Sequence, residues 1–206
     1  MAPSEKTNTT FDAATQLIPL VEQAQAGSRS AFAQLAERFH EEIFRMVFYR
    51  MRSRDDAEDV TQDVFLKAYQ KISTIKEAGK FRGWLFSITL NKIRDFQRKK
   101  RFRGLFKAED ENIETHPADS ADSAQPDALD HVLRKDFWYQ IELIMKKLPD
   151  MEREVFMLRF FDHLGINEIA ETLNKNESTI KTHLYRALAK FKKEPAMRRL
   201  LNEVTQ

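Results

Sequence analysis

Apolar side chains recur at intervals of three and four residues along much of the chain, and this spacing constrains the fold more than any other feature. The stretch SRSAFAQLAERFHEEIFRMVFYRMRS, residues 28–53, puts one set of residues on a single helix face: Phe32, Leu35, Ala36, Phe39, Ile43, Met46, Val47 and Arg50. This period predicts a long amphipathic helix. With only 5 Gly and 6 Pro in 206 residues, the whole chain is predicted to be all-α.

Three further helical patterns occur in the first half of the chain. Residues 14–27 predict a short helix closed by Gly27, since glycine favours the left-handed conformation after a helix. The stretch DDAEDVTQDVFLKAYQKIS opens with Asp55 and Asp56, which suit an N-cap and a first turn. Its inner stripe is Ala57, Val60, Val64, Ala68 and Ile72. After a loop, STIKEAGK, the stretch FRGWLFSITLNKIRDFQRKKRFR predicts the next helix.

An acidic segment separates these helices from a second set. Residues 107–130 contain only two large aliphatic residues, too little apolar surface to offset the entropy lost on ordering. Lys and Arg outnumber Asp and Glu by 19 to 13 in residues 1–104, whereas the ratio is 3 to 9 in residues 105–136 and 12 to 10 in residues 137–206. We therefore predict two small helical domains, residues 1–104 and 131–206, joined by an acidic flexible linker, residues 105–130.

The second domain is predicted to begin with a helix that Pro149 stops and to continue with a helix over residues 150–165, ending at Gly165. Residues 166–193 predict two helices with a break at Asn174 to Asn176. Asn174 suits the left-handed turn, and Asn176 suits the cap of the following helix.

The last two helices have the pattern of a helix-turn-helix. Their apolar faces are formed by Ile166, Ile169, Ala170 and Leu173 and by Ile180, Leu184, Ala187 and Leu188. Small Ala170 lets the helices approach closely. The outward residues of the second helix are Glu177, Ser178, Thr179, Lys181, Thr182 and Arg186. Short hydroxyls and an Arg near a helix N-terminus suit phosphates and base edges. A helical hairpin with a solvated charged face fits the spacing equally well.

Residues 81–103 combine eight basic residues and one acidic residue with one Trp and four Phe. One stripe of the predicted helix holds Ser87, Asn91, Arg94, Arg98 and Arg101, while the apolar residues lie away from it: Phe81, Trp84, Leu85, Ile88, Ile93 and Phe96. The aromatic residues therefore anchor the helix in a core, and the stripe offers hydrogen-bond donors.

Nucleic acid is the favoured partner of this stripe, because Arg side chains pair with phosphates. An anionic membrane surface fits less well, since the apolar side is needed to close the core. A solvated charged face is the third interpretation.

Several other functions are excluded or disfavoured by composition. The chain has no Cys, so disulfides, thiolate nucleophiles and Cys-based zinc sites are excluded. Its five His have no metal-ligand spacing, and no Gly-rich phosphate loop occurs. We expect no enzyme activity, no metal and no cofactor. No stretch reaches the roughly 18 apolar residues of a membrane span, and the polar start lacks a signal sequence, so we expect no membrane insertion and a cytoplasmic location.

Four motifs in order along residues 28–193 resemble the extracytoplasmic-function (ECF) group of sigma-70 family sigma factors. They are DDAEDVTQDVFLKAY; KFRGWLFSITLNKIRDFQRKKR with the acidic connector after it; LPDMEREVFMLRFF; and INEIAETLNKNESTIKTHLYRALAKF. The resemblance implies a two-domain factor that binds core RNA polymerase and directs transcription initiation at specific promoters, by recognising −35 and −10 elements and helping to melt the DNA.

The resemblance also implies which residues bind polymerase and the −10 element. The clamp coiled coil of the β′ subunit is expected to contact the acidic helix through Asp56, Glu58, Asp59, Gln62, Asp63 and Phe65. The −10 element is expected to contact the loop and the basic helix through Lys76, Lys80, Phe81, Arg82, Ser87, Asn91, Arg94 and Arg98. The loop would capture an unstacked base. Trp84 matches a common aromatic of the family, and its helical position favours a core role over base stacking.

In the second domain, the −35 element is expected to contact Ser178, Thr179, Lys181, Thr182 and Arg186, while a hydrophobic surface binds the β flap. The acidic linker either mimics nucleic acid in the RNA exit path or serves as a tether. An anti-sigma factor is an expected further partner. The chain departs from the family at Asn174, where many members have Gly, and at Ile75, where many have a second aromatic residue.

The main rival interpretation is a DNA-binding regulator that acts without polymerase. The sequence gives no promoter, regulon or inducing signal. It also gives no arrangement of the two domains and no role for residues 1–27.

Overall fold

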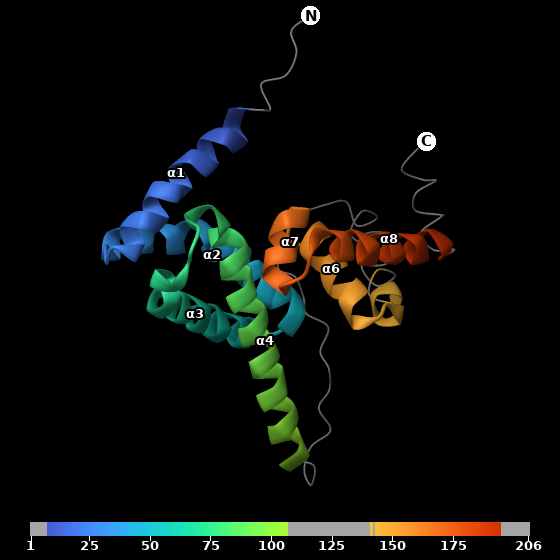
Figure 1. Cartoon of the computed structure of the whole chain (residues 1–206). Helices are drawn as coiled ribbons and strands as arrows, with labels where there is room; N and C mark the ends of the chain where they lie inside the picture. Colours follow the sequence, from blue (N-terminus) through green and yellow to red (C-terminus); the bar gives the residue numbers. More distant parts are fainter. Residues whose placement is uncertain (1–7, 107–140, 142, 195–206) are drawn as a thin grey trace, which may run out of the picture. The chain divides into compact units, whose positions relative to one another are not determined.

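The computed structural model of the chain describes residues 8–106, 141 and 143–194 (Figure 1). Every regular element in these ranges is a helix, which confirms the predicted all-α class. The described helices form two compact units, one built on α1 to α4 and the other on α6, α8 and most of α7. Nearly all of the predicted linker falls outside the described residues.

The first unit opens with α1 (Asn8–Gln25), which begins earlier than predicted and contains Pro19. Gly27 follows it with φ +97°, the left-handed conformation expected of a closing glycine. α2 (Arg29–Met51) comes next, and the hydroxyl of Ser28 accepts a hydrogen bond from the amide of Ala31 to cap it. Most of the predicted apolar face of α2 is buried: Phe32, Leu35, Phe39, Ile43, Met46 and Val47.

The helix α3 (Arg54–Lys71) has a different N-cap from the predicted one. The cap is Ser53, whose extended backbone aims its hydroxyl at the amide of Asp56. Asp55 and Asp56 lie in the first turn, where their charge still favours the helix dipole. The predicted inner stripe, from Ala57 to Ile72, is buried at all five positions. Two short 3-10 turns, η1 (Ile72–Thr74) and η2 (Ala78–Lys80), form the predicted loop.

The basic stretch forms α4 (Phe81–Phe106), and its two halves differ sharply. In the first half Leu85 and Phe86 are fully buried, and burial continues to Ile93, which is 2% exposed. Each fully buried large apolar side chain contributes about 1.5–3 kcal/mol. Beyond Phe96 and Gln97, which are half-buried, the described side chains are exposed. The second half of α4 extends past α2 and α3 (Figure 1).

The second unit contains α6 (Asp150–Phe160), α7 (Ile166–Leu173) and α8 (Glu177–Lys193), with residues 143–147 also helical. One cluster of its core brings together residues from α6, α8 and the segment before α6: Ile141, Ile144, Met145, Leu148, Phe156, Ala187 and Phe191. Ile169 and Ala170 of α7 are also buried. Lys190 of α8 donates to the buried carboxylate of Glu152 on α6 at 2.7 Å, which ties these two helices together.

The end of α6 differs from the prediction, which placed it at Gly165. The helix stops at Phe160, because the amide of Leu164 bonds to the carbonyl of Leu158 and closes a turn that buries Leu164 completely. His163 takes the left-handed conformation in this turn, with φ +55°. The predicted break further on is confirmed: Asn174 has φ +51°, and the side chain of Asn176 accepts from the amide of Thr179 at 2.8 Å.

Two buried threonines in the first unit yield a stability prediction. The hydroxyl of Thr61 on α3 has no hydrogen-bond partner among the described residues, whereas that of Thr89 on α4 donates to the carbonyl of Leu85 at 2.9 Å. A buried unpaired hydroxyl costs about 1–3 kcal/mol. We expect Thr61→Val to raise the free energy of unfolding by about 1 kcal/mol and Thr89→Val to lower it by about 0.5–1.5 kcal/mol.

Urea unfolding followed by Trp84 fluorescence, in a Trp138→Phe background, measures both changes. Equal effects of the two substitutions would show that the hydroxyl of Thr61 is satisfied in solution.

Candidate nucleic-acid and protein interfaces

The polar residues of α3 that are predicted to bind polymerase divide into two groups, according to whether α4 supplies a partner. Glu58, Asp59 and Gln62 are exposed, and Glu58 pairs with Arg54 on the same helix at 3.0 Å. Asp56 and Asp63 instead accept hydrogen bonds from lysines of α4, Lys100 and Lys92, each at 2.9 Å. The six predicted polymerase-binding residues thus do not form one continuous open face.

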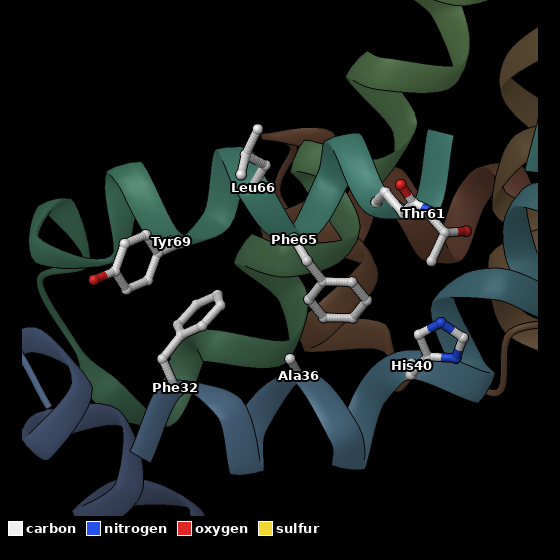
Figure 2. A pocket seen from close by; sticks show the side chains of 8 residues that line it. Phe32, Ala36, His40, Thr61, Phe65, Leu66 and Tyr69 are labelled. Atoms are coloured by element: carbon white, nitrogen blue, oxygen red, sulfur yellow. The ribbon is translucent and has the colours of Figure 1, made fainter. Parts of the chain in front are cut away.

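A groove of about 390 Å³ runs between α2 and α3. Figure 2 shows the ring of Phe65 pointing from α3 toward Ala36 of α2, with Phe32 and His40 on either side. Ring contacts cross the groove: Phe32 meets Tyr69 edge-on at 5.0 Å, and His40 stacks on Phe65 at 6.1 Å. Leu66 and Tyr69 on α3 are exposed. The groove therefore places apolar surface beside the exposed acidic residues of α3.

A side chain at the end of α1, about 50 residues earlier in the sequence, holds the loop after α3 by direct hydrogen bonds. The side-chain amide of Gln25 donates to the carbonyls of Ile72 and Ile75, at 3.2 and 2.8 Å. Ile75, which occupies the position of the second family aromatic, is buried. Of the two predicted loop contacts, Lys76 is exposed, and Lys80 is exposed but pairs with Glu77. The hydrogen bond to Glu77 raises the pKa of Lys80 above its ordinary value.

The predicted stripe on α4 is present as an exposed row. Asn91, Arg94, Arg98 and Arg101 are exposed, and Arg98 also pairs with Asp95 at 2.9 Å. Ser87 is half-buried and donates to the carbonyl of Trp84. A shallow hollow of about 480 Å³ follows the outer part of the row. Its arginines lie beside Gln97 and Phe102, and Phe102 is 57% exposed.

Two residues predicted to contact DNA lie elsewhere. Phe81 is 2% exposed, with its ring 5.4 Å from that of Phe39. Arg82 donates from two nitrogens to one carboxylate oxygen of Glu42 on α2, at 3.1 and 3.0 Å, and its guanidinium lies over the ring of Phe86. Trp84 is half-buried with its ring 5.9 Å from that of Phe81, as a core role requires.

The first turns of α8 carry the predicted −35 residues. Ser178, Lys181, Thr182 and Arg186 are exposed, and Thr179 is half-buried. Ser178 donates to the side chain of Asn176 and Thr182 to the carbonyl of Ser178, both at 2.9 Å, which fixes the two hydroxyls. Lys181 lies 3.3 Å from Glu177.

Tyr185 was missed by the sequence reasoning. It lies on α8, is 70% exposed, and stands between Lys181 and Arg186 on the outer face. Its spacing of three from Thr182 and four from Lys181 was a signal that could have identified it.

The described residues contain neither a candidate metal site nor a candidate membrane span. No group of three or more His, Asp or Glu is placed to hold a metal ion, and no helix in these ranges is long and apolar enough to cross a membrane.

Family comparisons agree with this geometry. The family model for Sigma-70 region 2 matches residues 35–103, from α2 to near the end of α4. The model for Sigma-70, region 4 matches residues 139–191, which include α6, α7 and most of α8.

The chain is similar to two curated sigma factors. It is 31% identical over 174 residues to the ECF RNA polymerase sigma factor BldN of Streptomyces coelicolor, covering 84% of this chain and 63% of BldN. It is 29% identical over 177 residues to the ECF RNA polymerase sigma factor SigW of Bacillus subtilis, covering 84% of this chain and 94% of SigW.

Among solved structures, the fold is similar to that of the sigma factor RpoE in complex with the anti-sigma factor NepR from Bartonella quintana. The TM-score is 0.57 at 22% identity, covering 83% of this chain and 96% of RpoE. Two family models in the order of the two units, together with the two curated relatives, identify the chain. It belongs to the extracytoplasmic-function group of the sigma-70 family, the sigma factors that direct transcription initiation at specific promoters.

Proposed function

We propose that the chain binds core RNA polymerase through the outer side of α3 and the adjoining groove. Glu58, Asp59 and Gln62 supply exposed acidic and polar groups, which suit a basic partner. Phe65 and Leu66 supply apolar surface beside them. A partner helix could therefore pack on apolar side chains and pair with charged groups at the edge of the same surface. In the polymerase this partner is the clamp coiled coil of β′.

The loop and α4 read the −10 element in this proposal. One observation carries it: α4 is anchored by its buried first half and presents an exposed row that begins at Asn91, near the end of that half, and continues with Arg94 and Arg98. Lys76, Lys80 and Ser87 extend the surface toward the loop, where a base is captured. Unstacking that base costs a few kcal/mol, and contacts to phosphate offset it. The proposed −10 surface does not include Phe81, which is buried, or Arg82, which is bound to Glu42.

The N-terminal part of α8 reads the −35 element. Ser178, Thr179, Lys181, Thr182 and Arg186 act as predicted, and Tyr185 joins them because of its exposure. The second unit also binds the β flap through its apolar surface. The linker either passes through the RNA exit path or acts as a tether.

The protein acts as a binding subunit without chemistry of its own, in the cytoplasm where its polymerase works. An anti-sigma factor is proposed as a further partner, because RpoE, whose fold is similar, was solved in complex with the anti-sigma factor NepR.

Run-off transcription from a promoter library, using bacterial core polymerase with and without the protein, tests this function. We expect initiation at a shared −35/−10 pair that depends on the protein and is weakened about tenfold by Asn91→Ala or Arg98→Ala, since a lost base or phosphate contact costs about 1–3 kcal/mol. Failure to initiate, together with retained duplex binding through residues 166–193, would favour a regulator that acts without polymerase.

The outer side of α3 and the adjoining groove, here called the docking face, give a prediction about polymerase binding. We expect Asp59→Lys to weaken binding to core polymerase about tenfold or more, because it places a positive charge against a basic partner. Fluorescence titration of labelled protein with core enzyme measures the affinity. The matched control is Glu22→Lys, which makes the same charge change at an exposed position on α1. Equal losses in the two variants would place the docking face elsewhere.

The exposed N-terminal part of α8, the proposed −35 surface, gives a prediction about promoter preference. We expect Arg186→Ala and Tyr185→Ala each to lower initiation from the selected promoter about five- to a hundredfold and to relax the preference at one or two −35 positions, since a specific base contact is worth about 1–3 kcal/mol. Lys193→Ala, at the far end of α8, should leave the preference unchanged. Sequencing the promoters that each holoenzyme selects gives the result, and an unaltered −35 preference in both variants would contradict it.

A further inference from the structure

Two ion pairs join α4 to α3 at successive levels. The ammonium of Lys92 lies 2.9 Å from a carboxylate oxygen of Asp63, and that of Lys100 lies 2.9 Å from a carboxylate oxygen of Asp56. Lys92 lies near the end of the buried half of α4. Lys100 lies about two turns further on, in the exposed half. The first pair therefore joins α3 to α4 where the buried half ends, and the second reaches the part of α4 that apolar packing no longer holds.

The two lysines do not share the face of the exposed row. At about 100° per residue, Lys92 and Lys100 each lie roughly 100° or more around the helix from Asn91, Arg94 and Arg98. The lysines thus face α3 while the row faces away from it. Binding of nucleic acid to the row does not require either ion pair to break.

Packing alone gives the outer half of α4 little support. Among the side chains of α4 that the structure describes, up to Phe102, Ile93 is the last that is buried, and Phe96 and Gln97 are half-buried. Arg98 and Arg101 of the row lie beyond that point. A small change of helix direction near Ile93 would therefore displace these two arginines relative to α3.

We propose that Asp56 and Asp63 are positioning residues: Asp63 holds Lys92 where the buried half of α4 ends, Asp56 holds Lys100 in the outer half, and together they fix the DNA-binding row relative to the proposed polymerase-binding face of α3. The expected effect on transcription initiation rests on the proposed function, whereas the positioning of α4 rests on the two ion pairs alone. The resemblance had assigned both carboxylates to polymerase. Because α3 carries the docking face and the two pairs, docking α3 on polymerase sets the direction of the row on the DNA.

Each pair is partly exposed: the side chains of Lys92 and Asp63 are 29% and 60% exposed, and those of Lys100 and Asp56 are 66% and 28% exposed. Partly exposed pairs hold weakly and are screened by salt. The expected effects are therefore a few-fold in function and a broader range of helix positions, not unfolding.

A distance measurement on the free full-length protein tests the geometric part. The chain has no Cys, so Gln70→Cys and Lys99→Cys allow two spin labels on α3 and α4, both at exposed positions. We expect Asp63→Asn and Lys100→Gln each to broaden the distance distribution. The charge-swapped pair Asp63→Lys with Lys92→Asp should restore it, and Asp59→Asn on the same helix should leave it unchanged. An unchanged distribution in both single variants would overturn the proposal.

The functional part is measured on the holoenzyme. We expect Asp63→Asn to keep the affinity for core polymerase within about twofold and to lower initiation two- to fivefold on the promoter selected by the unaltered protein, with recovery in the charge-swapped pair. Asp59→Asn should show the opposite pattern, a loss of core affinity. If Asp63→Asn weakens core binding as much as Asp59→Asn and the swap does not restore it, then Asp63 contacts polymerase directly and the proposal is wrong.

Failure of the proposed function can be told apart from failure of the positioning proposal. If the unaltered protein neither binds core polymerase nor supports initiation, the proposed function fails, while the label distances still decide whether the ion pairs hold α4.

Discussion

Burial of the first half of α4 on nearly every side is the constraint on which the first unit depends. Leu85 and Phe86 are fully buried and Leu90 is 2% exposed, so this segment packs against its neighbours around most of its circumference. Even Thr89 is buried, and its hydroxyl is satisfied inside the helix by the carbonyl of Leu85. A helix enclosed in this way offers little binding surface there, since Ser87 is only half-buried and the first exposed donor is Asn91. Most of its exposed donors lie further along, where the helix has left the core.

The two helices proposed to bind DNA are supported in different ways. α4 divides along its length, with a buried first half and an exposed second half. α8 divides around its circumference: Ile180, Ala187 and Phe191 are buried, while Tyr185 on the opposite side is 70% exposed. A helix that divides around its circumference is supported along its whole length by its own core face. A helix that divides along its length needs other support for its outer half, and on α4 the lysine–carboxylate pairs are placed to give it.

The sequence predicted what local rules determine. The spacing of three and four located the helices, and single residues set the breaks: Gly27 and Asn174 took left-handed conformations, and Asn176 capped α8. The structure differs from these expectations where contacts occur that such rules do not contain. α6 stops at Phe160 because burying Leu164 closes a turn. Arg82 was predicted on the DNA-binding surface, yet it is bound by Glu42, which lies 40 residues away in the sequence.

The acidic residues of α3 show the same limit at the binding surface. A helical wheel places Asp59 and Asp63 near one another, and their charge is equal, so sequence alone gives both the same role. Packing separates them, because Lys92 of α4, 29 residues further along the chain, lies within hydrogen-bond distance of Asp63. A carboxylate that already has a lysine partner must give it up before it binds another basic group, which lowers its net contribution to docking. The strength of the proposed polymerase-binding face therefore depends on which acidic residues α4 leaves without a lysine partner, not on how many α3 contains.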